Sequence, residues 1–167
     1  LAGFQTQSYM SQKRAVNALL GEYQNVIIAL QRVIADVSYA NLTTVINPGS
    51  DPNCESIQTT LSHVVSSGYS YAGYIRKLKK IDDNRPGKIL RLSIAEYIED
   101  LNNLIQYTQD TFENIHDDEL EVFEEERKIK TSWGQTYDIE QMMEHAVVHV
   151  LRHRRQIEKF IKKLDAL

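Results

Sequence analysis

Three histidines near the C-terminal end are the residues of this chain best suited to chemistry. His145, His149 and His153 follow one another at intervals of four residues. On a helix, residues four positions apart share one face, with Cβ atoms about 5–6 Å apart, and two imidazoles at that spacing can hold one zinc ion through bonds of about 2.0–2.1 Å. The spacing therefore predicts a histidine pair that binds a divalent metal.

The apolar residues around the histidines indicate which pair faces the protein interior. At about 100° per residue, His153 lies about 40° and His149 about 80° from the centre of the aliphatic stripe, whereas His145 lies near 120°. We therefore expect His149 and His153 to be the ligand pair. His145 is expected to be a partly exposed helix residue, with a supporting donor or an alternative ligand as its other interpretations. Ala146 and Val150 follow His145 and His149, so the His-Glu-x-x-His motif of zinc proteases is absent.

A catalytic zinc site usually has three protein ligands and one open position, so a third ligand is needed. His63 is the one histidine of the second predicted helix, about 120° from the centre of its aliphatic stripe, on a flank shared with Ser67 and Tyr74. This geometry permits a place in a crevice between helices but does not select His63. His116 lies in an acidic connection, and no other histidine lies three or four positions from it. From the residues alone, metal binding and a plain structural role for the histidines both stay open.

Four amphipathic segments would carry these histidines, because apolar residues recur in each at steps of three and four. Strand signals are almost absent, so the sequence predicts an all-α protein, an antiparallel four-helix bundle forming one domain over residues 1–167. A long acidic connection, residues 116–137, is expected between the third and fourth helices. The predicted helix starts are a Ser11 cap, Asp51 followed by Pro52, a capping box of Ser93 with Glu96, and Asp138 with Gln141.

Composition excludes several classes of protein. The net charge of -4 provides no general basic field for nucleic acid. Cys54 is the only cysteine, so an internal disulfide and a cysteine zinc finger are excluded, and it lies about two and a half helical turns from His63, too far to share a metal. No apolar run approaches the roughly 20 residues of a membrane span, and no signal pattern is present. We expect a cytoplasmic protein without nucleic-acid or membrane partners.

Two segments taken together resemble the DinB-like family of metal-binding four-helix bundles. They are Leu61-Ser62-His63-Val64, midway along the second helix, and residues 149–157, which read His-x3-His-x2-Gln-Ile. Helix order, chain length and the long connection before the last helix agree with the family. The chain departs from the family at Arg152, where a second histidine is common, and at Arg155, where glycine is common. These changes leave the histidines intact but alter the expected mouth of the site.

The resemblance implies a ligand triad of His63, His149 and His153 that holds a divalent metal, zinc or nickel. The resemblance also implies a small-molecule substrate. Dimers are common among the proteins that this chain resembles. Such relatives include transferases that use low-molecular-weight bacterial thiols and metal-dependent hydrolases. We expect a thiol transferase, because no serine or cysteine nucleophile is evident beside the triad. A hydrolase with metal-activated water, or a non-enzymatic metal-binding stress-response protein, are the alternatives.

Overall fold

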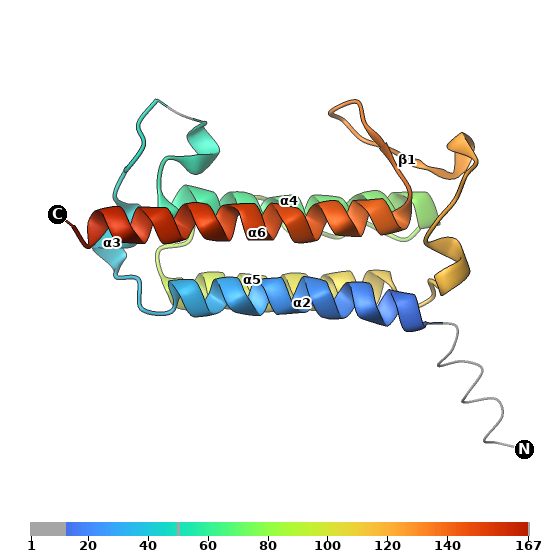
Figure 1. The fold of residues 1–167 in the computed structure, drawn as a ribbon, viewed down its shortest axis with the longest axis horizontal. Helices are drawn as coiled ribbons and strands as arrows, with labels where there is room; N and C mark the ends of the chain where they lie inside the picture. The colour runs from blue at the N-terminus through green and yellow to red at the C-terminus, as the bar shows by residue number, and fades with distance from the viewer. Residues whose placement is uncertain (1–12, 50, 167) are drawn as a thin grey trace, which may run out of the picture.

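The computed structural model describes residues 13–49 and 51–166, and these residues are mostly helical. Four long helices lie side by side along the long axis of the molecule (Figure 1). They are α2 (Arg14–Ile34), α4 (Ile57–Lys79), α5 (Ile94–Thr111) and α6 (Ile139–Leu164). None of these described helices is apolar over a stretch long enough to cross a membrane. The all-α prediction is therefore confirmed at the level of secondary structure.

Shorter elements fill the connections between the long helices. A two-stranded antiparallel sheet pairs Ile129 with Tyr137 and Lys130 with Thr136, inside the connection that the sequence analysis treated as an acidic loop. The prediction missed it because strands of two residues are too short to show an alternating pattern. The remaining short elements are α3 (Tyr39–Thr43), η1 (Pro52–Cys54), η2 (Asp117–Glu119), η3 (Glu125–Arg127), β1 (Ile129–Lys130) and β2 (Thr136–Tyr137).

The helix caps explain where three of the long helices begin. The Ser93 hydroxyl accepts the backbone N–H of Glu96, and the Asp138 carboxylate accepts that of Gln141 at 2.8 Å, as the sequence predicted. Asp51 caps only the short η1, whereas α4 begins six residues later behind its own cap, Ser56. The Asp51 prediction was thus wrong for the long helix, because the Pro52 turn ends before α4 starts. The predicted Ser11 cap lies outside the described residues.

The directions of α2 and α5 follow from contacts at their ends. The Lys13 ammonium, just before α2, donates to the carbonyl of Phe112 at the end of α5, at 2.9 Å. At the opposite end, the Gln31 amide donates to Asn102 Oδ1 at 2.9 Å. These two helices therefore run antiparallel, whereas α2 and α6 run in the same direction (Figure 1).

The pair α4 and α5 runs parallel, which differs from the antiparallel prediction. The Tyr97 hydroxyl donates to the carbonyl of Gln58 at 2.9 Å near the start of both helices, and Arg76 Nε donates to Thr111 Oγ1 at 2.7 Å near both ends. The connection of residues 80–93 makes this possible because it runs back along the molecule (Figure 1). It is fixed to α4 where Ser62 Oγ donates to the carbonyl of Ile89 at 2.8 Å.

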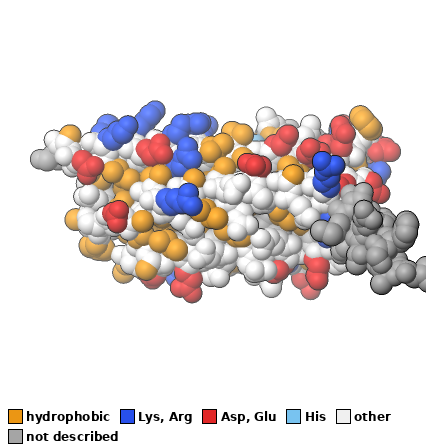
Figure 2. All heavy atoms as spheres, turned by 60° about the horizontal axis from the view of Figure 1, so that its bottom comes forward, with side chains coloured by type: hydrophobic (Ala, Val, Ile, Leu, Met, Phe, Trp, Pro, Cys, Tyr) orange, Lys and Arg blue, Asp and Glu red, His pale blue; other side chains and the backbone are white. Residues whose placement is uncertain are grey.

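The hydrophobic core lies between the four long helices. All four contribute, and each large side chain that is fully buried is worth roughly 1.5–3 kcal/mol relative to exposure. On the face drawn in Figure 2, several Lys and Arg side chains gather near the C-terminal end, and acidic side chains are spread over the whole face. The largest fully buried side chains include Tyr97, Phe112, Ile27, Leu30, Ile34, Leu42, Ile57 and Leu61.

Candidate metal centre

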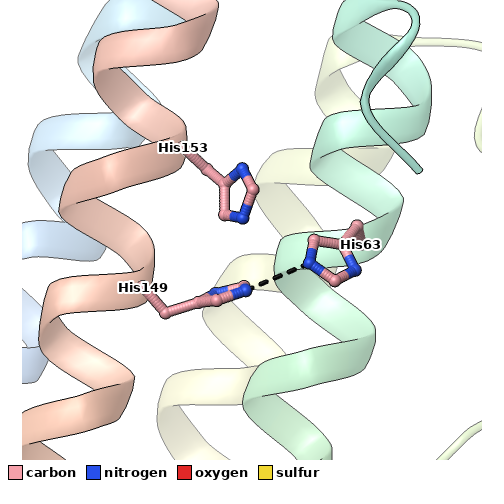
Figure 3. Close-up of side chains that lie close together, drawn as sticks. All are labelled: His63, His149 and His153. Carbon is pink, nitrogen blue, oxygen red and sulfur yellow. Dashed lines mark hydrogen bonds between the residues drawn. The ribbon is translucent and has the colours of Figure 1, made fainter. Parts of the chain in front are cut away.

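Helices α4 and α6 bring together three histidines from two segments that are 86 positions apart in the sequence. His63 lies in the second turn of α4, and His149 and His153 lie one turn apart near the middle of α6. Their imidazoles point toward one another across the space between the two helices (Figure 3). His153 is buried, whereas His149 and His63 are partly buried. The three residues named as ligands by family resemblance thus form one cluster.

The distances within the cluster fit a single small ion. Nε2 of His149 lies 3.1 Å from Nε2 of His63. One nitrogen from each of the three rings falls within 4.8 Å of the others. Two nitrogens bound to one zinc ion at about 2.0–2.1 Å with tetrahedral angles would lie about 3.3 Å apart. A modest movement of His153 would therefore complete a three-nitrogen shell.

Hydrogen bonds orient two of the rings for metal binding. Nδ1 of His153 lies 2.9 Å from Oε1 of Gln156. Because an amide oxygen only accepts, the imidazole carries its proton on Nδ1 and leaves the lone pair of Nε2 free. Ser67 Oγ lies 3.5 Å from Nδ1 of His63, which leaves the opposite nitrogen directed into the cluster. The sequence analysis named Ser67 on the flank of His63 and included Gln156 in the His-x3-His-x2-Gln-Ile segment, but it did not pair Gln156 with His153.

Burial keeps the cluster uncharged. Desolvation lowers the pKa of His149 to about 3, and repulsion from His153, His63 and His145 adds to this effect. Desolvation also lowers the pKa of His63 and of His153. Histidine binds metal only as the neutral imidazole, so these shifts favour the ligand form at neutral pH.

His149 also carries an unsatisfied polar atom. Its Nδ1 is buried and has no hydrogen-bond partner among the described residues. A buried donor without an acceptor costs about 1–3 kcal/mol, so the protein keeps His149 here at a cost to its stability. Such a cost is typical of a functional position. The fit to a divalent metal ion comes from the other side of the ring, where Nε2 of His149 meets the nitrogens of His63 and His153.

His145 lies outside this cluster, in a group of aromatic rings. It stacks on Trp133 with ring centroids 5.7 Å apart and contacts Tyr71 edge-on at 5.2 Å. Its Nδ1 lies 3.3 Å from the hydroxyl of Tyr137. His145 therefore anchors the β1–β2 hairpin against α6, and in this arrangement it is not a ligand.

His63 lines two cavities on different sides of the cluster. The first, which we call the α4 cavity, has a volume of about 530 Å³ and extends from His63 past Tyr71 and Trp133 to Lys77 and Arg85. The second, which we call the cysteine cavity, has a volume of about 390 Å³. Its lining consists of Asn47, Asp51, Cys54, His63, His149, Arg152, His153 and Gln156. Two molecules could thus reach the cluster from two directions.

The cysteine cavity contains residues whose place the sequence did not reveal. Cys54 is not among the donor atoms of the cluster, in keeping with its predicted distance, yet its side chain lines the same cavity. It gets there because η1 folds the chain back before α4 begins. Desolvation raises the pKa of the Cys54 thiol, and the nearby charge of Asp51 adds to this. Arg152, expected at the mouth of the site, lines the cavity as well.

Comparison with known proteins identifies a family. A family model described as the DinB superfamily matches residues 29–157. This range contains all three histidines and every residue that lines the two cavities. The searches of curated proteins and of solved structures returned no significant match.

Proposed function

We propose, from the premise that this chain belongs to the DinB superfamily, that His63, His149 and His153 hold one divalent metal ion, zinc or nickel, for the transfer of a low-molecular-weight thiol. The proposal treats the four long helices as the four-helix bundle of that family. We further propose that the protein is cytoplasmic, that its partners are small molecules and neither nucleic acid nor membranes, and that it can form a homodimer.

One observation carries the proposal: three neutral imidazoles point toward one another, and one nitrogen from each lies within 4.8 Å of the other two. A divalent metal bound there would act as a Lewis acid and lower the pKa of a thiol or a water in its open position. Imidazole suits both zinc and nickel, so the donor set does not separate them. The two cavities that meet at His63 favour transfer between two bound molecules over hydrolysis of one.

The chain's own residues would orient and protect this centre. Gln156 fixes the His153 ring, and Ser67 lies beside the outer nitrogen of His63. Arg152 places a positive charge at the mouth of the cysteine cavity, which favours the approach of an anionic thiolate. The raised pKa of Cys54 keeps its thiol protonated and weakly nucleophilic at neutral pH, so an external thiol is the better nucleophile.

The test is elemental analysis of tag-free protein purified without added metal. Wild-type protein should contain about one zinc or nickel ion per chain, and the His149→Ala/His153→Ala variant should contain almost none. His145→Ala is the matched control, because it removes a histidine from the same helix but outside the cluster. No metal in the wild type, even after reconstitution, would exclude the metal site.

Activity assays then separate the three functions. Metal-loaded protein is offered an electrophile with and without a low-molecular-weight thiol. Consumption of the electrophile only in the presence of thiol supports the transferase. Turnover without thiol indicates a hydrolase, and a metal-loaded protein inactive in both assays indicates a binding protein without catalysis.

A further inference from the structure

We propose that the α4 cavity binds an elongated small molecule through an acidic group, a carboxylate or a phosphate, held by Lys77 and Arg85 about four helical turns from His63. The statement that this molecule is a substrate rests on the proposed function, because the other end of the cavity reaches the metal cluster. The binding of the acidic group does not require the metal.

One continuous face of α4 lines the cavity. Its residues recur at steps of three and four, as one side of a helix requires, and none is a large aliphatic residue. Serines supply hydroxyl groups in the first half of this face, and Lys77 ends it. At about 1.5 Å per residue, the 14 positions from His63 to Lys77 span about 20 Å, the length of an extended small molecule. The α4 residues of this face are His63, Ser66, Ser67, Ser70, Tyr71, Gly73, Tyr74 and Lys77.

The charge at the far end of the cavity is positive. Lys77 and Arg85 line it, and none of the described residues that line it is acidic. Lys77 forms no ion pair with any carboxylate of residues 13–49 and 51–166. Arg85 Nε lies 3.4 Å from Asp83 Oδ2, outside the cavity lining, which orients the guanidinium while its other nitrogens stay available. An anion would therefore meet Lys77, which has no carboxylate partner among the described residues, and Arg85, whose charge is shared with Asp83.

Gly73 provides the space in which the Arg85 side chain lies. A Cβ built at Gly73 would lie 3.0 Å from Arg85 Nη1 and 3.1 Å from Asp83 Oδ2, closer than side chains normally approach, so the Arg85–Asp83 ion pair lies against the helix here. Glycine within a helix costs about 1 kcal/mol relative to alanine, so its presence in the buried part of α4 needs a compensating reason. Contact between the guanidinium and the bare helix backbone supplies that reason, and it holds the cation against the cavity wall.

An aromatic wall covers the middle of the cavity. Trp133, at the tip of the β1–β2 hairpin, packs edge-on against Tyr74 at 5.6 Å and against Tyr71 at 6.3 Å. The Tyr74 hydroxyl ties the hairpin to α4, because it donates to Ser132 Oγ at 3.0 Å and accepts the Ser132 N–H at 2.9 Å. The ligand would thus lie between hydroxyl groups on one side and aromatic rings on the other.

The test uses Trp133 as its reporter, because it is the only tryptophan of the chain and lines this cavity. Glutathione serves as the probe, since it is an extended thiol with two carboxylates, and its diester, which keeps the thiol and the ammonium group, serves as the counterpart without an acidic group. Both are titrated into wild-type protein while tryptophan emission is recorded. The Lys77→Gln/Arg85→Gln variant removes the two cations, and Lys162→Gln/Lys163→Gln removes two exposed cations at the far end of α6 as the matched control.

We expect glutathione to change the emission saturably and to bind about tenfold more tightly than its diester, since two partly exposed ion pairs contribute about this much. The cavity variant should lose this difference, and the α6 control should keep it. Inorganic phosphate as a competitor tests for a phosphate subsite, and competition by acetate alone tests for a carboxylate subsite; either result supports the proposal. Equal binding of acid and diester, an unchanged affinity in the cavity variant, or no emission change with either probe would overturn it.

The same titration on the His149→Ala/His153→Ala protein separates this inference from the proposed function. If the wild type binds no metal but both proteins still bind glutathione more tightly than the diester, the anion site stands and the metal site fails. If metal binds but the cavity variant behaves as wild type, the metal site stands and the anion site fails.

Discussion

Replacing His149 should change how the stability of the metal-free protein depends on pH. The ordinary pKa of histidine in an unfolded chain is about 6.5, and burial lowers that of folded His149 to about 3. Between these values the unfolded chain binds a proton that the folded protein does not, so acid favours unfolding. The stability contributed by neutral His149 is therefore complete above pH 6.5 and is lost progressively as the pH falls toward 3.

The magnitude follows from the two pKa values. Between pH 7.5 and pH 5, the linkage relation gives a loss of about 2 kcal/mol in the free energy of unfolding from His149 alone. This is a large share of a domain stability of about 5–15 kcal/mol. His149→Gln removes the titrating ring, so its stability should fall by about 2 kcal/mol less than that of the wild type over the same pH interval.

Urea denaturation of chelator-treated protein, followed by far-UV circular dichroism at several pH values, measures this difference. His145→Gln is the control: desolvation lowers the pKa of His145 too, but no neighbouring charge adds to it, so this variant should keep most of the pH dependence. Parallel stability curves for wild type and His149→Gln would refute the reasoning, because they would mean that His149 is charged or well hydrated in the folded protein.

Three further results are expected. Gln156→Leu should weaken zinc binding about 10–100-fold in a chelator competition assay, because the His153 ring loses the acceptor that fixes its proton; an unchanged affinity would show that the contact has no such role. Gly68→Ala should lower the urea stability by about 1–3 kcal/mol, since a Cβ there would lie 2.5 Å from Leu104 Cδ2 and 2.7 Å from the Tyr23 hydroxyl; a neutral substitution would mean that α5 can shift. Zinc at about 100 times its Kd should stabilise the wild type by about 2.7 kcal/mol and the double histidine variant not at all, as measured by thermal denaturation.

The helices could be predicted from sequence because apolar spacing and caps are local signals. Ser93 and Asp138 cap the helices assigned to them, and the stripe angles correctly ranked His153 as more buried than His149. The direction of α5 could not be predicted in this way. A connection of 14 residues can extend to about 46 Å, enough to return along the whole of α4, and nothing local distinguishes that path from a compact turn.

Parts of the candidate site depend on such non-local placement. The stripe angle of His63 could not select it, because its neighbours depend on where α6 passes α4. Cys54 and Asp51 enter the cysteine cavity only because η1 folds back on the histidines. Of the α4 face from Ser66 to Lys77, the sequence analysis identified only Ser67 and Tyr74, on the flank of His63. That this face lines a cavity is evident only in the structure, where the hairpin places Trp133 on the same cavity.

The wide sequence separation within the cluster has a consequence for biosynthesis. His63 and His149 are 86 positions apart, and α6 follows every other helix that the structure describes. Chains emerge from the ribosome N-terminal end first, so a nascent chain that has completed α4 and α5 presents His63 as a lone imidazole, a poor competitor for cellular zinc or nickel. Metal acquisition would then wait until α6 has been made and has docked, and a chain that stalls or misfolds earlier would not trap an ion.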